Sequence, residues 1–334
     1  MNDASPLITA QQKFVEAVPL RILGNEMCSL SEALGRTLYT DILAPTDMPP
    51  YPRAIVEGFV VNTADTDGAT EDSPKSFQIV GEIKPGDSEC PRIKKGQALR
   101  VATGSIVSPD APFSVVRMWE AQMQGNTFEI TRPFPPRFFI EEQGCDLTQN
   151  AVALKAGTTL TPFDIGMIAS LGIHQVKVSR QPNITIFASG NEVIPFTESI
   201  SPGKIRDSNS IMLAAAVTEA GGIPDLAGVM KDDFDTFAAA IANALQDADM
   251  VIISGGTAVG GRDFIADMIR QTGKLVIDGV PMRSGKPLIM GMAENKPLVC
   301  VAGHPPEALR GFRLFGVAAI NRLLGKESDL PLDE

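Results

Sequence analysis

The C-terminal half of this 334-residue sequence predicts a doubly wound α/β domain with a mostly parallel sheet. Three observations lead to this fold class. Short apolar runs such as NITIFAS and MVIIS alternate with longer segments of helical periodicity such as DFDTFAAAIANALQDA. Glycine ends several of the apolar runs, as in FASG, ISGG and VAG. The segment lengths suit strand–helix–strand units, which pack helices on both faces of a parallel sheet.

This domain is expected over residues 181–326, with a short tail at 327–334. Strands are expected at NITIFAS, DLAGVM, DMVIIS, KLVIDGV, PLIMGMA and PLVCVAG, and helices at NSIMLAAAVTEA, DFDTFAAAIANALQDA, RDFIADMIRQT and PEALRGFRLFGVAAINRLL. Paired glycines stop the first of these helices, and Asp233 or Asp235 lies near the start of the second. The sequence leaves the order of the strands open.

The N-terminal half predicts two further parts. Residues 7–38 have a helical pattern, in which Ser29 or Ser31 can cap a short helix, and the proline-rich stretch at 44–52 marks a boundary. Short alternating runs from GFVVN to NTFEITRPF then predict a β-rich small domain at 45–146. We assign residues 1–44 together with 147–180 to an elongated helical and linker domain, with a strand, the helix PFDIGMIASLG and the strand HQVKVSR in its second segment.

Composition excludes several classes of function. The net charge of −11 argues against a nucleic-acid partner and against docking on anionic membranes, because both need a basic surface. The four cysteines form no C-x-x-C pair, so a structural zinc site and a disulfide framework are not expected. The N-terminus lacks the pattern of a secretory signal, and no apolar run is long enough to span a bilayer. We therefore expect a cytoplasmic protein.

A ligand site is expected at the carboxyl ends of the parallel strands, where open α/β sheets bind ligands. Three segments lie there, beginning at Ser189, Ser254 and Gly303. In the middle segment Ser254, Gly255, Gly256 and Thr257 follow a buried strand, and glycines allow a backbone to approach a phosphate closely. A tight strand-to-helix turn without a ligand is the alternative, and the pattern favours the two about equally.

Acidic and basic side chains cluster at the same edge. The acidic ones are Glu192, Asp207, Asp232 and Asp263, and such carboxylates hold Mg²⁺ and bridge it to a phosphate. The alternative for Asp207 and Asp233 is helix capping, which we favour, and Asp263 can serve a helix dipole instead. Arg283 and Lys286 lie in a stiff turn suited to an anion, with solvated surface charge as the alternative. His304 is interpreted as part of a helix-starting turn.

Many short motifs in a fixed order resemble the molybdopterin molybdenumtransferase family, the bacterial MoeA and gephyrin E-domain type. They run through nearly the whole chain: Ala33-Leu34-Gly35-Arg36, Pro49-Pro50-Tyr51, Glu57-Gly58-Phe59, Ala102-Thr103-Gly104-Ser105, Gly144-Cys145-Asp146, Ser189-Gly190-Asn191-Glu192, Asp207-Ser208-Asn209, Lys231-Asp232-Asp233, Ser254-Gly255-Gly256-Thr257, Gly285-Lys286-Pro287 and Gly303-His304-Pro305. The resemblance implies that the α/β domain is of the MogA and MoaB type. It also implies a homodimer that binds adenylated molybdopterin, cleaves its phosphoanhydride with Mg²⁺ and inserts molybdate.

The resemblance also implies the residues of the site. Those in catalytic positions are Glu57, Thr103, Asp146, Glu192, Asp232 and Asp263, of which Glu192 and Asp263 hold the metal. Those that bind the pterin nucleotide are Asp207, Asn209, Ser254, Gly255, Gly256, Thr257, Arg283, Lys286, Gly303 and Pro305. The family site lies between the α/β domain of one subunit and the N-terminal domains of the other. Other molybdenum-cofactor proteins are possible partners.

This sequence departs from the family pattern at several of these motifs. Asn191 replaces an acidic residue, and Glu57 replaces an aspartate. The arginine-rich stretch before Asp146 contains Glu141 and Glu142, a reversal of charge. The sequence ends at Glu334, where relatives usually continue into a small β domain, so we expect that domain to be lacking. These departures leave three functions open: an active enzyme, a catalytically weakened pterin carrier or molybdoenzyme assembly partner, and an enzyme acting on another nucleotide.

Overall fold

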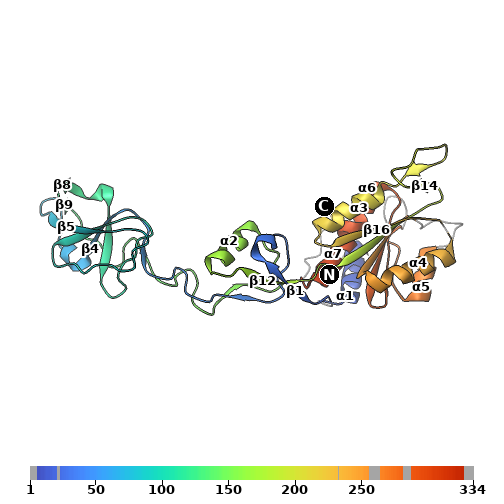
Figure 1. Ribbon diagram of the computed structural model, residues 1–334, viewed down its shortest axis with the longest axis horizontal. Helices are drawn as coiled ribbons and strands as arrows, with labels where there is room; N and C mark the ends of the chain where they lie inside the picture. The colour runs from blue at the N-terminus through green and yellow to red at the C-terminus, as the bar shows by residue number, and fades with distance from the viewer. Residues whose placement is uncertain (1–5, 21–22, 232, 256–263, 281–286, 327–334) are drawn as a thin grey trace. The chain divides into compact units, whose positions relative to one another are not determined.

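The computed structural model describes residues 6–20, 23–231, 233–255, 264–280 and 287–326 (Figure 1). The chain forms two compact units, one of residues 1–41 with 155–334 and the other of residues 42–154. No helix within the described ranges is both long enough and apolar enough to cross a membrane.

A six-stranded sheet forms the centre of the larger unit, with the strand order β16-β13-β17-β20-β19-β18. Its strands are β13 (Asn183–Ser189), β16 (Ile223–Met230), β17 (Met250–Ser254), β18 (Lys274–Asp278), β19 (Ile289–Ala293) and β20 (Lys296–Val301). The neighbours from β16 to β20 pair in parallel, whereas β19 pairs antiparallel with both β20 and β18. The sheet is therefore mixed. The expected parallel pairing holds for β16, β13, β17 and β20. Strands β19 and β18 extend the sheet beyond β20 with antiparallel pairing.

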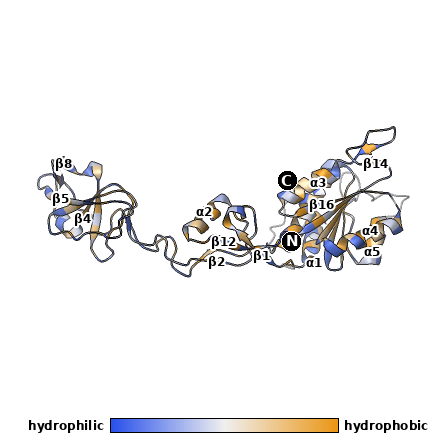
Figure 2. Ribbon diagram, in the orientation of Figure 1, coloured by the Kyte–Doolittle hydropathy of each residue, from blue (hydrophilic) through white to orange (hydrophobic). Residues whose placement is uncertain are grey.

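Helices cover both faces of this sheet, as expected for a doubly wound domain (Figure 1). The helices are α1 (Pro6–Ala17), α3 (Asn209–Glu219), α4 (Phe234–Asp247), α5 (Phe264–Thr272), α6 (Pro305–Gly311) and α7 (Val317–Leu324), with a π-helical segment, Phe312–Gly316, between the last two. Side chains alternate across each strand, so Ile252 faces a core with α1, α3, α6 and α7 while Val251 and Ile253 face a core with α4 and α5. Figure 2 shows the apolar colour concentrated on the strands between these layers.

The first segment of the chain differs from its expected helical pattern. Only α1 is helical over 6–17; Asn25–Ser29 forms β1, which pairs antiparallel with β12 (Gln175–Ser179), and Leu30–Glu32 is a 3₁₀ turn. The prediction of a helix through residue 38 was wrong, because pairing with a strand about 150 residues away outweighs the local pattern. Ser29 and Ser31 bond to each other rather than capping a helix. The predicted helix α2 (Pro162–Ser170) is present, and Thr161 begins it with a capping box.

The smaller unit contains a second six-stranded sheet, with the order β7-β4-β6-β5-β9-β8. Its strands are β4 (Gly58–Asn62), β5 (Lys75–Ile83), β6 (Gln97–Val101), β7 (Phe113–Arg117), β8 (Gln122–Gln124) and β9 (Thr127–Ile130). Short pairs join β2 (Ile42–Leu43) to β11 (Val152–Leu154) and β3 (Arg53–Ala54) to β10 (Ile140–Glu141). The short alternating runs predicted this β-rich fold, and stacked Phe59, Phe77 and Phe128 fill part of its core.

Candidate functional site

The strand order places a topological switch point between β13 and β17. After β13 the chain passes through α3 to β16 on one side, and after α4 it returns to β17 on the other side. Helices that leave in opposite directions open a crevice at the carboxyl ends of the two strands, which is where open α/β sheets bind ligands. Ser189 and Ser254, the last residues of these strands, therefore flank the expected position of a ligand.

Gly255 allows these two strand ends to approach each other closely. Its φ is +89°, and a Cβ at this position would lie 2.5 Å from the carbonyl oxygen of Ser189. Its amide N–H donates to the carbonyl of Val301 at 3.1 Å, which adds the end of β20 to the same cluster. Only glycine fits such a position without moving the backbone. The structure thus gives Gly255 a packing role in addition to the phosphate-binding role expected from the sequence.

Asn209, at the start of α3, links the loops that follow β17 and β20. Its Nδ2 atom donates to Ser254 Oγ at 2.7 Å and to the carbonyl of Gly303 at 2.8 Å. The Ser254 hydroxyl in turn donates to the carbonyl of Ala302 at 3.3 Å. The three predicted binding residues Asn209, Ser254 and Gly303 are therefore brought together by the fold, and one amide group holds them in place.

Two polar atoms at this point have no hydrogen-bond partner in the described part of the chain. They are the Oδ1 atom of Asn209 and the hydroxyl of Ser210, and both are buried. A buried polar atom without a partner costs about 1–3 kcal/mol, so such atoms are rare in a folded protein unless they serve a function. Both lie in the first turn of α3, where backbone N–H groups favour an anion. Ser210 was not among the residues predicted from the sequence.

Two of the predicted acidic residues cap helices, as favoured from the sequence. Asp207 Oδ1 accepts a hydrogen bond from the backbone N–H of Ser210 at 3.0 Å, at the start of α3. Asp233 accepts from the backbone N–H of Thr236 at 3.0 Å, and its hydrogen bonds to Thr236 hold the pKa of its carboxyl below the ordinary value. His304 immediately precedes α6, whose first residue is Pro305, and it makes no side-chain capping bond.

Glu192 lies on the loop that leaves β13, and its side chain is exposed. The side chain folds back over Gly190, where a Cβ would lie 2.9 Å from Glu192 Oε2. The loop is held by a parallel pairing of β14 (Val193–Ile194) with β15 (Ile205–Arg206) and by a hydrogen bond from the N–H of Ile205 to the carbonyl of Glu192 at 2.9 Å. Glu192 therefore presents a carboxylate at the carboxyl edge of the sheet, as predicted.

Several other predicted site residues lie outside the described ranges. They are Asp232, Gly256, Thr257, Asp263, Arg283 and Lys286. Their roles remain predictions.

The smaller unit brings Glu57 and Thr103 to one end of its sheet. Strands β4 and β6 are antiparallel, with Gly58 opposite Val101, so the register continued by one residue places Glu57 opposite Ala102 and next to Thr103. The turn that contains Thr103 is held against β3, since the N–H of Gly104 donates to the carbonyl of Ala54 at 2.8 Å. Two predicted positions separated by 46 residues in sequence thus lie just beyond the same end of the β4–β6 pair.

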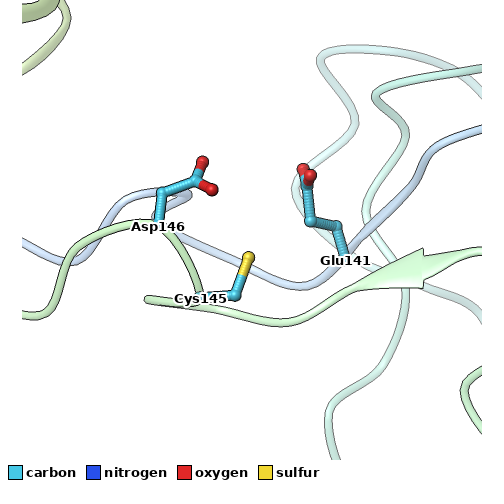
Figure 3. Close-up of side chains that lie close together, drawn as sticks. All are labelled: Glu141, Cys145 and Asp146. Atoms are coloured by element: carbon cyan, nitrogen blue, oxygen red, sulfur yellow. The ribbon is translucent and has the colours of Figure 1, made fainter.

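Asp146 lies near two further potential ligands, Glu141 and Cys145. One ligand atom of each lies within 4.8 Å of the others, and Figure 3 shows the two carboxylates and the sulfur facing a common space. Desolvation and the negative charges of Asp146 and Glu141 raise the pKa of the Cys145 thiol. A protonated thiol is a poor metal ligand, so a cation here would depend on the two carboxylates.

Comparison with known proteins identifies the family. Residues 6–172 match the model for the MoeA N-terminal region (domain I and II), and residues 185–322 match that for a probable molybdopterin binding domain. A molybdopterin molybdenumtransferase of Nostoc sp. is 31% identical over 304 residues, which cover 90% of this chain and 70% of the relative. The chain belongs to the molybdopterin molybdenumtransferase family.

Further relatives agree with this membership. A molybdopterin molybdenumtransferase of Staphylococcus epidermidis is 28% identical over 304 residues, 91% of this chain and 72% of the relative. The crystal structure of a molybdopterin biosynthesis MoeA protein from Pyrococcus horikoshii superposes with a TM-score of 0.82 at 28% identity, covering 97% of this chain and 80% of that one. The resemblance found in the sequence motifs is confirmed over both units.

Within this molybdopterin molybdenumtransferase homologue, the charge reversal before Asp146 is offset by arginines elsewhere in the sequence. Arg53 Nε donates to Glu141 Oε2 at 2.6 Å, and Arg137 Nη2 donates to Glu142 Oε2 at 2.8 Å. The Arg137 hydrogen bonds lower the pKa of the Glu142 carboxyl, which stays ionised. Arg53 and Arg137 were not predicted from the sequence as partners of these carboxylates, because neither lies in the motif. The antiparallel pairing of β3 with β10 brings Arg53 to Glu141.

Proposed function

We propose that this protein is an active enzyme of molybdenum-cofactor biosynthesis, one that inserts molybdate into adenylated molybdopterin. The pterin nucleotide binds at the carboxyl edge of the six-stranded sheet, in the crevice between β13 and β17. Family membership supports the transferase activity, and the geometry of the strand ends supports the position. The alternative function, a catalytically weakened pterin carrier or molybdoenzyme assembly partner, is less favoured, since no feature of the described residues supports it.

The observation that carries the proposal is the pair of buried, unpaired polar atoms beside the Asn209 clamp. Asn209 fixes the loops after β17 and β20 through its amide group, while its Oδ1 atom and the Ser210 hydroxyl have no partner in the described ranges. Ligand groups that bond to these atoms would remove a desolvation cost that the free protein bears. The first turn of α3 adds backbone N–H groups and a favourable dipole for a phosphate.

The donor chemistry at this edge fits Mg²⁺. Glu192 offers a carboxylate there, and hard divalent cations bind carboxylate oxygens together with oxygens of a substrate phosphate. Asp263, which the sequence places after the glycine loop, is the second proposed ligand. The ion would supply neutralisation of the charge on the phosphoanhydride. The protein residues hold the nucleotide in position: Asn209 sets the loops, and Gly255 keeps the strand ends close.

Other parts of the proposal rest on the family resemblance. Glu57, Thr103, Asp146 and Asp232 are proposed catalytic residues, and Gly256, Thr257, Arg283 and Lys286 are proposed to bind the nucleotide. We further propose a cytoplasmic homodimer that works with other molybdenum-cofactor proteins. Sedimentation of the purified chain at micromolar concentration would test the dimer, since a monomer mass would contradict it.

Release of AMP from adenylated molybdopterin tests the activity. The purified chain, with Mg²⁺ and molybdate, is expected to release AMP, and Glu192→Gln should lower the rate about a hundredfold, the usual effect of losing one preorganised electrostatic contact. Glu198→Gln is the matched control, because Glu198 lies exposed on the same loop and its side chain has no proposed role. Equal rates for the two variants would remove Glu192 from the site, and no AMP from the wild type would refute the enzyme.

A further inference from the structure

An open cavity of about 680 Å³ lies in the larger unit, away from the strand ends described above. It is lined by a turn of residues 155–158, by Leu20 and by the end of α7 at Gly325 and Lys326. The α6–α7 segment starts at the carboxyl edge of the sheet, and its 20 residues span roughly 30 Å at 1.5 Å per residue. Leu324 lies beside Gly221, since a Cβ on that glycine would be 3.3 Å from the leucine side chain. Gly221 precedes the amino end of β16, so the cavity lies at the opposite edge of the sheet from the proposed pterin site.

The walls of this cavity are fixed by backbone contacts. The turn closes with a hydrogen bond from the N–H of Thr158 to the carbonyl of Lys155 at 3.2 Å, and Gly157 has a φ of +87°. A Cβ on Gly157 would lie 3.2 Å from the carbonyl oxygen of Gly325, so the turn packs directly on the end of α7. The N–H of Lys326 donates to the carbonyl of Asn321 at 2.9 Å. The backbone at both lysines of the lining is thus hydrogen-bonded.

The two lysines of the lining differ in their partners, since Lys155 is exposed and paired with an acid while Lys326 has no acidic partner among the described residues. The Lys155 ammonium lies 3.1 Å from Asp41 Oδ2, while the other oxygen of Asp41 accepts from the N–H of Ala156 at 2.8 Å. No acidic partner of the Lys326 ammonium is found in the described ranges, and burial lowers its pKa. The Thr158 hydroxyl has no hydrogen-bond partner among the described residues. Within the described residues, the partly buried Lys326 ammonium therefore carries a charge that no acidic side chain offsets, and a bound anion would stabilise it.

We infer that this cavity binds a small organic phosphate, with Lys326 and Lys155 on the phosphate and Leu20 on the organic part. Cavities of 300–1,000 Å³ are typical of small-molecule sites, and free phosphate would fill only a small part of this one. Leu20 is 42% exposed and supplies an apolar wall. The inference is independent of the proposed function, because it concerns the opposite edge of the sheet.

Amine labelling of the full chain tests the inference. Phenyl phosphate is the probe, and mass spectrometry follows the reaction of each lysine with a neutral acylating reagent. A bound phosphate should raise the pKa of Lys326, and a rise of one unit slows its labelling about tenfold. The exposed Lys95 of the other unit should label at an unchanged rate. Lys155→Gln should weaken the protection of Lys326, whereas Lys177→Gln, at an exposed position outside the cavity, should not.

Two outcomes would overturn the inference. Unchanged labelling of Lys326 at saturating phenyl phosphate, compared with chloride at equal ionic strength, would mean that the cavity binds no phosphate. Equal protection in the wild type and in Lys155→Gln would mean that the two lysines do not act together. Inorganic phosphate is the second probe, and it should protect Lys326 from labelling only at higher concentration than phenyl phosphate. Equal protection by the two probes at the same concentration would mean that the cavity binds the free ion and not an organic phosphate. AMP release should be unaffected by Lys155→Gln, so failure here is distinguishable from failure of the proposed function.

Discussion

The close approach of β13 and β17 can be tested by adding one methyl group at Gly255. Gly255→Ala places a Cβ 2.5 Å from the backbone carbonyl oxygen of Ser189, in a residue with φ of +89°. A positive φ alone costs an alanine about 1–2 kcal/mol. Because the contacted atom belongs to the backbone of a buried strand, the overlap cannot be relieved by a side-chain rotation, and overpacking of this kind costs about 1–3 kcal/mol more. We expect a total loss of about 2–5 kcal/mol in the free energy of unfolding.

Gly203→Ala separates the two contributions. Gly203 has a φ of +78°, but a Cβ there would have no neighbour within 4 Å, so only the conformational cost of about 1–2 kcal/mol applies. Urea unfolding followed by far-UV circular dichroism gives the comparison. The one tryptophan, Trp119, lies in the other unit, so its fluorescence transition should stay unchanged in both variants. If Gly255→Ala is no less stable than Gly203→Ala, the close approach is not a constraint on the sequence.

Three further outcomes are expected. Asp249→Ala should lower the free energy of unfolding by about 2 kcal/mol, because Asp249 is buried and accepts two hydrogen bonds from Arg180 and one from the N–H of Asn183. The control Asp267→Ala breaks an exposed ion pair with Arg270 and should cost less than about 1 kcal/mol. Similar losses for the two variants in circular-dichroism melts would refute this. Phe14→Ala should cost about 3–5 kcal/mol in the same melts, because Phe14 is fully buried against Phe315, and a loss below 1 kcal/mol would show that α1 does not pack on the sheet. Hydrogen bonds from Arg117 and Arg132 lower the pKa of Glu120, so the carboxylate stabilises the fold above pH 4.5, the ordinary pKa of the group, and this stability is lost as the pH falls below that value. Glu120→Gln should therefore reduce the loss of stability at acid pH, measured by Trp119 fluorescence in urea at a series of pH values. An unchanged dependence on pH would contradict the assignment.

The fold was predictable wherever one local period dominated a segment. The strands of the α/β domain appeared as short apolar runs because both their faces are buried, as at Ile252 and its neighbours Val251 and Ile253. The strand β1 was missed because Asn25–Ser29 has no strong period of its own and is fixed by pairing with β12. The strand β19 was predicted, but its antiparallel direction was not, since an apolar run shows burial and not direction.

The candidate site was predictable where a motif contains its own structural reason. Asp207 precedes a helix and caps it, and Gly255 follows a buried strand at a close approach, so both were identified from local sequence. Ser210 was not identified, because a serine in the first turn of a helix is common. Its importance appears only when its buried hydroxyl is found without a partner in the described ranges. Contacts between distant segments, such as Asn209 with Gly303, needed coordinates.

The acidic stretch before Asp146 has a different local charge in the folded structure from the one that the sequence alone suggests. Read along the chain, Glu141 and Glu142 replace cations with anions. In the structure each carboxylate is matched by an arginine, so the local result is two neutral pairs. A neutral pair repels an anionic ligand less than a bare carboxylate does, but it attracts the ligand less than an arginine would. Under the proposed function, neutralisation of the substrate should therefore depend more heavily on Mg²⁺. AMP release is then expected to fall steeply as the metal is diluted, and a rate that does not change with the Mg²⁺ concentration would contradict this.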